Sequence, residues 1–320
     1  MRPPAGSELF VKEIALKTGF SLVGITSPVH PAKSKTIYKD WLGAGKHAAM
    51  HYLSRWREKR DQPGLLLEGA GSIICVALNY YPGRPGPAGK DGQHNRRGRV
   101  SIYSHGRDYH LVVGEMLEDM AAALSNKFPG MRSVACVDNR PVAERTWALQ
   151  AGIGWLGRNT CLISPQFGSW LFLGELITSL DLRPDQPLNG SCGDCRLCIE
   201  ACPTGALGED YSLDANSCIS YLTIEHRGDI PEQFHRSIAG RVFGCDECQR
   251  VCPHNSAVPT TRIPDFNTFN PLSGLDLKSI LSMNDSELQL LAKDSVIARC
   301  GPAGLRRNAR IALANIESKD

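Results

Sequence analysis

The 320-residue sequence lacks any long apolar run, and this absence bears on where the protein works. No stretch approaches the roughly 20 apolar residues that a membrane-spanning helix needs. The first residues, from Met1 to Ser7, lack the apolar core of an export signal. We therefore expect a cytoplasmic protein without a membrane partner, in a reducing compartment where disulfides are rare. Hydrophobic residues make up 42% and charged residues 22% of the chain, as in globular proteins.

A strong net charge is also missing, since the formal charge at pH 7 is only +3. A balance this small does not by itself indicate a nucleic-acid partner. The basic residues are unevenly spread, and the segments 90–107 and 293–310 each hold five basic residues against one acid. Such segments fit a phosphate-binding surface, and they fit ordinary solvated faces equally well. The candidate phosphate contacts in them are Arg96, Arg97, Arg99, Arg306, Arg307 and Arg310.

Cysteine, in contrast, is abundant, and eight of the 12 cysteines form one pattern. A first run of four has two, two and three residues between its members and is followed directly by proline. A second run of three repeats the end of this spacing and is also followed by proline, and one further cysteine lies between the runs. The eight are Cys192, Cys195, Cys198, Cys202, Cys218, Cys245, Cys248 and Cys252.

This spacing is typical of two-cluster ferredoxins, in which the fourth cysteine of each run ligates the cluster of the other run. It predicts two 4Fe–4S clusters that use all eight thiolates. One would be bound by Cys192, Cys195, Cys198 and Cys252, and the other by Cys202, Cys218, Cys245 and Cys248. The alternatives are zinc, which also uses cysteine pairs two residues apart, and disulfides, which a reducing compartment disfavours.

Hydrophobic patterning predicts an N-terminal domain in which helices and strands alternate irregularly. Helices are expected at 8–19, 111–128 and 142–151, and strands at 20–25, 72–81, 133–137 and 170–177. Residues 82–98, rich in Pro, Gly and charge, are expected to form a surface loop. Two amphipathic helices are predicted after the cysteine-rich part, at 275–291 and 305–316. The predicted fold class is α+β, with domains at 1–182, 183–260 and 261–320.

Two local features compete as candidate sites in the N-terminal part. Gly152-x-Gly154-x-x-Gly157 matches the dinucleotide-binding fingerprint as a string. Its context does not fit, because it follows a predicted helix rather than a strand, so we expect a tight turn packed on the sheet. Asp138 ends an apolar strand beside a proline-containing turn. An apolar neighbourhood there would keep its carboxyl protonated for proton donation, and the alternative is a helix N-cap.

The chain resembles the epoxyqueuosine reductase family, the cobalamin-dependent iron–sulfur enzymes of the last step in making queuosine in tRNA. The resemblance runs nearly end to end, and strings outside the cysteine runs make it specific. These strings are Lys59-Arg60-Asp61, Ser101-x-Tyr103-x-x-Gly106-Arg107-Asp108-Tyr109-His110, Val137-Asp138, Glu144-Arg145, Ala151-Gly152-x-Gly154-Trp155-x-Gly157, Gly168-Ser169-x-x-Phe172-Leu173-Gly174-Glu175, Cys218-Ile219-Ser220-Tyr221-Leu222-Thr223-Ile224-Glu225 and Arg307-Asn308-Ala309.

The resemblance implies a cobalamin held between an N-terminal α/β domain, similar to that of reductive dehalogenases, and a two-cluster ferredoxin-like module. A small C-terminal helical segment would be HEAT-like. Asp138 would be the proton donor. By the same resemblance, cobalamin contacts would fall at or beside Arg60, Ser104, Asp138, Arg158, Ser169, Leu173 and Ser220. Arg158 stands where many relatives have Lys, which keeps the charge and changes the donor geometry.

The implied activity is the reduction of epoxyqueuosine to queuosine at the wobble position of tRNA with GUN anticodons. Opening an epoxide to an alkene takes two electrons and two protons, which suits clusters that pass electrons singly to a corrin and an acid that protonates the leaving oxygen. The partners would be the tRNA and an external low-potential reductant, and we expect a monomer. The alternatives are a reductive dehalogenase-like cobalamin enzyme acting on a small molecule and a plain electron carrier.

Overall fold

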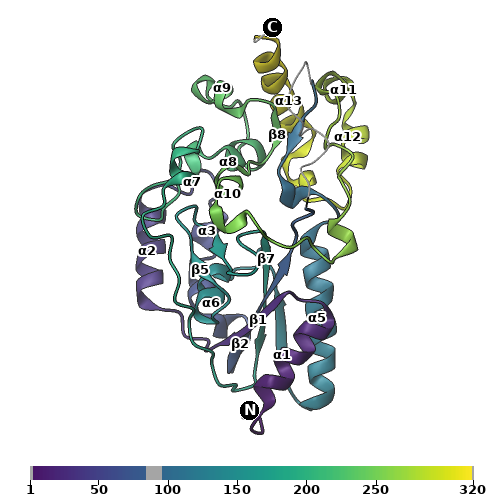
Figure 1. Ribbon diagram of the computed structural model, residues 1–320. Helices are drawn as coiled ribbons and strands as arrows, with labels where there is room; N and C mark the ends of the chain where they lie inside the picture. Colours follow the sequence, from purple (N-terminus) through teal and green to yellow (C-terminus); the bar gives the residue numbers. More distant parts are fainter. Residues whose placement is uncertain (1–2, 84–95, 319–320) are drawn as a thin grey trace.

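A four-stranded sheet forms the centre of the N-terminal part (Figure 1). The computed structural model describes residues 3–83 and 96–318, so most of the predicted loop 82–98 lies outside the described residues. The strand order is β1-β2-β7-β4, and all neighbouring strands are antiparallel. The strands are β1 (Leu22–Thr26), β2 (Ser72–Asn79), β4 (Ser133–Cys136) and β7 (Leu171–Thr178). Each corresponds to a strand that hydrophobic patterning predicts.

Helices cover both faces of this sheet, so all eight residues of β2 are buried. Even-numbered side chains from Ile74 to Leu78 pack with α1 and α5, whereas odd-numbered ones from Ile73 to Ala77 pack with α6. The alternation follows from the two-residue period of a strand. The helices are α1 (Ser7–Thr18), α5 (Tyr109–Lys127) and α6 (Glu144–Gln150). All three match predicted helices.

The glycine-rich string follows α6, as expected, and enters a small hairpin of two short strands. These are β5 (Trp155–Leu156) and β6 (Leu162–Ile163). A Cβ atom on Gly152 would lie 2.5 Å from the carbonyl oxygen of Gln186, and one on Gly154 would lie 2.3 Å from that of Ile163. The glycines therefore permit close backbone packing after a helix, which is a structural use of the string.

Between β1 and β2 lie three helices that hydrophobic patterning does not predict. They are α2 (Ala32–Gly43), α3 (Tyr52–Arg55) and α4 (Arg57–Asp61). None of their residues is buried, so the sequence carries no apolar stripe to mark them. Aromatic rings are in contact within these helices. Tyr38 stacks on Trp41 with ring centroids 6.0 Å apart, and Tyr52 meets Trp56 edge-on at 5.2 Å.

The cysteine-rich part consists of short elements above the sheet (Figure 1). They are α7 (Leu197–Glu200), α8 (Ile219–Ile224), α9 (His235–Ile238), β8 (Arg241–Phe243) and α10 (Glu247–Arg250). Strand β8 pairs in parallel with β3 (Arg99–Val100) from the N-terminal part. Val242 and Phe243 belong to the same apolar cluster as the C-terminal helices, and Ile219 packs in a cluster with Ile311. This part therefore shares its core with the chain on both sides.

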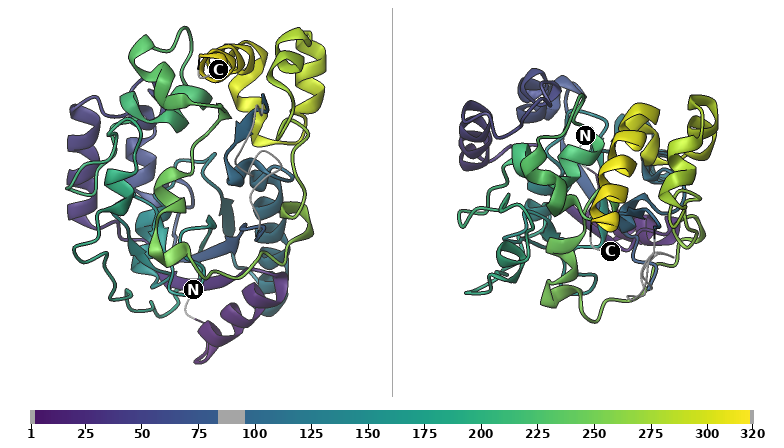
Figure 2. Two further views of the ribbon diagram at one scale, coloured as in Figure 1. Left: turned by 45° about the horizontal axis from the view of Figure 1, so that its top comes forward. Right: turned by 90° about the horizontal axis from the view of Figure 1, so that it is seen from above.

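The C-terminal helices lie beside β8 (Figure 2). They are α11 (Leu277–Ser282), α12 (Asp285–Leu291) and α13 (Gly301–Glu317). The predicted helix 275–291 is thus two helices, because Asn284 caps α12. Its side chain accepts from the amide of Glu287, whose carboxylate accepts from the amide of Asn284. No helix of the described chain is long and apolar enough to cross a membrane. The domain bounds after 182 and 260 stay predictions.

Asn308 on α13 is fully buried, and its amide donates to the carbonyl oxygens of Thr223 and Val242, both at 2.8 Å. We expect Asn308→Ala to lower the free energy of unfolding by about 1–3 kcal/mol, because buried carbonyl groups lose a donor. Denaturant unfolding of the anaerobic protein measures this. Arg310→Ala, at an exposed position on the same helix, is the control. Equal unfolding of the two variants would contradict the prediction.

Candidate functional site

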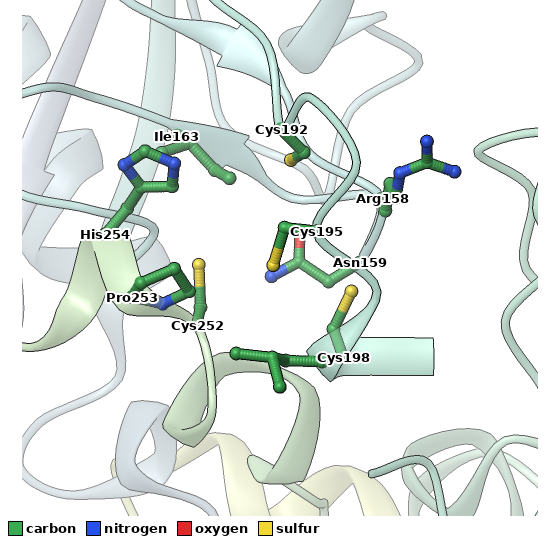
Figure 3. Close-up of a pocket in the computed structure, with 10 residues that line it drawn as sticks. Arg158, Asn159, Ile163, Cys192, Cys195, Cys198, Cys252, Pro253 and His254 are labelled. Atoms are coloured by element: carbon green, nitrogen blue, oxygen red, sulfur yellow. The ribbon is translucent and has the colours of Figure 1, made fainter. Parts of the chain in front are cut away.

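Four cysteines line one pocket that opens to solvent (Figure 3). Three belong to the first run, and the fourth is the last cysteine of the second run. They are Cys192, Cys195, Cys198 and Cys252. Ile163, Leu197 and Pro253 complete the apolar part of the lining, with His254 beside them. Because a cubane cluster takes a thiolate at each of four separate iron corners, four thiols around one shared cavity suit this group.

The remaining four cysteines of the pattern form a second set. Burial raises the pKa of Cys218, and the nearby thiol of Cys202 raises it further. Burial likewise raises the pKa of Cys245 to about 11, with Cys218 adding to the rise. Cys248 has a raised pKa from burial, with Cys245 among the thiols that add to it. These thiols are therefore electrostatic neighbours, and an iron cluster would stabilise the thiolates that burial alone disfavours.

Cys161 lies close to both sets, although no spacing in the sequence points to it. Burial raises its pKa to about 11, and the thiols of Cys252, Cys198 and Cys218 add to the rise. Among the described residues, no three His, Cys, Asp or Glu side chains converge closely enough to hold one metal ion. The four cysteines of the first set surround a pocket, which suits a cluster of several iron atoms rather than a single metal ion.

Asp246, between two cysteines of the second set, joins that set to the N-terminal part. It is 5% exposed, and its Oδ2 accepts from the amide of Ile102 at 2.9 Å. Its Oδ1 accepts from the hydroxyl of Ser101. Ser104, a predicted cofactor contact, follows in the same turn and donates to the carbonyl oxygen of Ser101 at 2.7 Å. Ser104 is buried, so its hydroxyl serves this turn.

Ser169, another predicted cofactor contact, joins the sheet to the end of the second run. Its amide donates to Asn255 Oδ1 at 2.7 Å, and Asn255 Nδ2 donates back to its hydroxyl at 2.9 Å. Gln249 Nε2 donates to its carbonyl oxygen at 2.9 Å. Ser220 lies in the first turn of α8 and donates to the carbonyl oxygen of Cys245 at 3.5 Å. Both serines therefore lie beside the cysteine runs.

The other predicted cofactor contacts lie apart from these serines. Arg158 lines the cysteine cavity, and its Nη2 donates to the carbonyl oxygen of Gly193 at 3.2 Å. Arg60 donates to the carbonyl oxygen of Val142 at 2.9 Å, on the α6 side of the sheet. Leu173 on β7 is half-buried and packs on that same side. The predicted contacts thus border two regions, and their roles stay predictions.

Asp138 follows β4, and its side chain is 43% exposed. Its Oδ2 accepts from the Tyr109 hydroxyl at 2.5 Å, and its Oδ1 lies 2.6 Å from His110 Nε2. The Tyr109 ring stacks on Phe172 with centroids 4.2 Å apart, which fixes the hydroxyl. These surroundings are polar and open. They differ from the apolar neighbourhood that the sequence suggests.

His110 connects Asp138 to a second carboxylate. Its Nδ1 lies 2.7 Å from Asp108 Oδ1, and Asp108 is held in place as the N-cap of α5. Burial alone would lower the pKa of His110, but the hydrogen bonds to Asp108 and Asp138 outweigh it and raise the pKa to about 9. At neutral pH the ring is therefore charged and donates to both carboxylates. Sequence reasoning assigned no role to His110, although Asp108-Tyr109-His110 directly precedes the predicted helix 111–128.

Two further acids, one fully buried and one half-buried, act electrostatically on the region of Asp138. Glu175 on β7 is fully buried, and neither of its oxygens has a hydrogen-bond partner. Burial raises its pKa to about 8, the charge of Asp138 raises it further, and the charge of Arg60 opposes the rise. Burial also raises the pKa of Glu144 at the start of α6, and Glu175 adds to it. Both acids therefore favour their neutral forms.

The six arginines predicted to contact phosphate differ in whether their guanidinium groups already have protein partners. Arg306 donates to the carbonyl oxygen of Met283 at 2.6 Å and to Asp285 Oδ1 at 2.6 Å. Arg307 donates to the carbonyl oxygen of Gly228 at 2.7 Å. These guanidinium groups thus already have protein partners. The others, Arg96, Arg97, Arg99 and Arg310, are exposed, with Arg96 Nη2 at 4.0 Å from Glu317 Oε1. Phosphate binding by all six stays a prediction.

Comparisons with known proteins assign both parts of the site to families. Residues 191–255 match the family described as "4Fe-4S double cluster binding domain". Residues 60–139 match "Epoxyqueuosine reductase QueG, DUF1730". The first match spans both cysteine runs, and the second spans Asp108, His110 and Asp138.

Relatives match over nearly the whole chain. The epoxyqueuosine reductase of Gloeobacter violaceus is 39% identical over 309 residues, which cover 95% of this chain and 94% of that protein. A crystal structure of epoxyqueuosine reductase with an epoxyqueuosine-modified tRNA-Tyr stem loop superimposes with a TM-score of 0.90 at 31% identity, covering 97% of this chain and 82% of that chain. The Bacillus subtilis enzyme, with its aspartate catalytic loop swung out of the active site, gives 0.89 at 31% identity, with the same coverage of both chains.

The separation of the cysteines into two sets is testable at Cys218. We expect Cys218→Ala to lower the iron content of the anaerobically reconstituted protein from about eight atoms per chain to about four, because only the second set loses a ligand. Iron and sulfide analysis with electron paramagnetic resonance of the reduced protein measures this. Cys75→Ala, in the core of the sheet, is the control and should keep both clusters. A Cys218→Ala protein with unperturbed clusters would make Cys218 a bystander.

Proposed function

The chain belongs to the epoxyqueuosine reductase family, and we propose that it reduces epoxyqueuosine to queuosine at the wobble position of tRNA. The observation that carries this proposal is the hydrogen-bonded series Asp108–His110–Asp138, which ends in an exposed carboxyl group. The proposal includes tRNA with GUN anticodons as substrate, an external low-potential reductant, a monomeric protein and a cytoplasmic location. The names of the relatives favour this reaction over small-molecule dehalogenation.

Two 4Fe–4S clusters and a cobalamin are the proposed cofactors. The cysteine cavity fits one cluster, and the second set of neighbouring thiols fits the other. A corrin presents methyl and amide groups, and the half-buried Leu173 and Ser220 offer apolar contact and a hydroxyl for them. When bound, cobalamin supplies the reduced metal centre that passes electrons to the epoxide. Arg60, Ser104, Arg158 and Ser169 remain proposed contacts or supports of that site.

The chain's own contribution to the chemistry is proton delivery. The epoxide oxygen takes up one proton when the ring opens to an alcohol and a second when it leaves as water. Asp138 is an exposed carboxyl group placed to donate a proton. Asp138 accepts hydrogen bonds at both oxygens, from Tyr109 and from His110. The charged His110 can therefore pass its proton to Asp138, which gives it to the epoxide oxygen, and His110 then regains a proton from solvent. This route replaces the apolar protection that the sequence suggests.

We expect Asp138→Asn to lose about 10²–10⁴-fold in turnover of epoxyqueuosine-containing tRNA, because the amide has no acidic proton to give. The tRNA dissociation constant and the iron content should stay unchanged, since Asn keeps the size and polarity. Single-turnover assays followed by nucleoside mass spectrometry measure the rate. Asp119→Asn, at an exposed position on α5, is the control. An Asp138→Asn enzyme with near-normal turnover would remove Asp138 from the mechanism.

The raised pKa of His110, about 9, predicts the pH dependence. The ring is charged below this pH and loses its proton as the pH rises through it, so kcat/KM should fall above about pH 9. Asp108→Asn removes one carboxylate partner, and the midpoint of that fall should move toward the usual His value of 6.5. The measurement is kcat/KM against pH.

Glu115→Gln removes an exposed acid on the same helix, which pairs with Arg107, and it is the control for this pH profile. Its midpoint should equal that of the wild type. If Asp108→Asn and Glu115→Gln share the wild-type midpoint, another group limits turnover at high pH.

A further inference from the structure

The segment from Lys33 to Arg60 is much more basic than the rest of the chain. It has eight Lys and Arg residues against two acids, so its net charge of +6 is twice the +3 of the whole protein. Charge concentrated in this way attracts polyanions by releasing their counterions. The segment comprises α2–α4 and the turns between them, and the sequence analysis did not single it out.

Five of the eight basic side chains of this segment are exposed, whereas Lys35, Lys46 and Arg60 are half-buried. The five exposed ones are Lys33, Lys39, Arg55, Arg57 and Lys59. Within the part of the chain that the structure describes, none of the five has an ion pair or a side-chain hydrogen bond, in contrast to Arg306 and Arg307. We call these five residues the α2–α4 basic face. Figure 2 shows the helices that carry it at one edge of the molecule in both views.

The backbone beneath the basic face is fixed rather than loose. Trp41 Nε1 donates to the carbonyl oxygen of Leu213 at 2.7 Å, and the amide of Ala49 donates to the Tyr221 hydroxyl at 3.1 Å. Arg60 lies with its Cζ 4.4 Å from the centroid of the Tyr38 ring. These contacts hold α2–α4 against the cysteine-rich part, so the free cations project from a preformed surface.

The basic face adjoins the catalytic series. Arg60, at the end of α4, donates to Val142, four residues beyond Asp138. Arg299 Cζ lies 5.6 Å from the centroid of the Tyr52 ring on α3. The charge of Asp138 is among those that raise the pKa of the Tyr52 hydroxyl. A polyanion bound along α3 and α4 would therefore pass beside Asp138. An RNA loop whose base must reach Asp138 carries phosphates on both sides of that base.

We propose that the α2–α4 basic face binds the phosphate backbone of the substrate RNA next to the base that enters the active site. The proposal rests on the proposed function, since it takes the anticodon stem loop as the ligand. Arg55, Arg57 and Lys59 on α3 and α4 hold the phosphates nearest to Asp138. Lys33 and Lys39 on α2 lie farther along the face and extend the contact toward the stem.

The test is a triple variant, Arg55→Gln with Arg57→Gln and Lys59→Gln, on the anaerobic holoprotein. Fluorescence anisotropy measures its affinity for a labelled anticodon stem loop over a range of salt concentrations. We expect binding to weaken about tenfold or more at low salt, and the slope of log affinity against log salt to fall by about 2, because each phosphate contact contributes about 0.7–0.9. An unmodified stem loop of the same sequence should lose as much, since phosphate contacts do not read the base.

The matched control is Lys17→Gln with Lys127→Gln and Arg183→Gln, which removes the same charge from exposed positions on α1, α5 and the loop after β7. It should keep the wild-type slope, so a general change of net charge is excluded. At saturating RNA the Arg55/Arg57/Lys59 variant should keep the wild-type single-turnover rate, since Asp138 is untouched. Thus KM should rise while kcat stays.

The outcomes separate this proposal from the proposed function. If the wild type reduces epoxyqueuosine RNA and both triple variants bind it equally well, the basic face is a solvated surface and only this proposal fails. If the wild type binds the stem loop through the basic face but reduces nothing, the proposed reaction fails while the RNA surface stands. A wild type that does not bind RNA overturns both.

Discussion

The placement of the clusters depends on one buried carboxylate, Asp246, which sits between two cysteines of the second set. Its oxygens accept from Ser101 and from the amide of Ile102, both in the N-terminal part. The cysteine-rich part shares its apolar clusters with the C-terminal helices, and these polar contacts, with those between Ser169 and Asn255, join it to the N-terminal part. Because burial raises the pKa of Asp246, these donors are needed to keep it charged. The position of the cysteine sets relative to the sheet therefore relies on a hydrogen-bonded junction.

A second constraint acts on the other side of the sheet. Glu175 is buried without a hydrogen-bond partner and shares the charge of Arg60 with Glu144. An arrangement of this kind costs stability, and such costs concentrate at functional sites. Both acids act electrostatically on the region of Asp138, and their neutral forms avoid adding negative charge behind it. His110, charged at neutral pH, holds a proton within hydrogen-bond distance of Asp138. The site is thus defined by several titrating groups together.

The sequence was sufficient where one side-chain type or period decides the structure. Cysteine spacing identified the cluster-binding part, and the all-apolar β2 was visible because helices cover both of its faces. It was insufficient where partners are distant. Nothing local shows that Arg307 donates to carbonyl groups near α8, or that Asn284 ends one helix and starts another. Helices α2–α4 were not predicted because none of their residues is buried, so no apolar stripe marks them. The residues that hold them, Leu213 and Tyr221, are also distant in the sequence. The role of His110 could not be predicted, because it depends on the contact with Asp138, which follows β4 and is distant in the sequence.

In the proposed reaction, electrons, a proton and the RNA substrate would each reach Asp138 from a different part of the structure. Electrons would come from the cysteine sets above the sheet, whose position Asp246 fixes relative to the N-terminal part. In the proposed reaction the proton would come from the Asp108–His110 pair at the first turn of α5. The RNA would arrive over α2–α4, where charge is free and the backbone is held by the cysteine-rich part. Because α2–α4 are hydrogen-bonded to Leu213 and Tyr221 of the cysteine-rich part, the proposed RNA surface is fixed relative to the cysteine sets. A reaction that needs an electron, a proton and a base at one point benefits from such a fixed arrangement, because binding then holds the reacting groups in position.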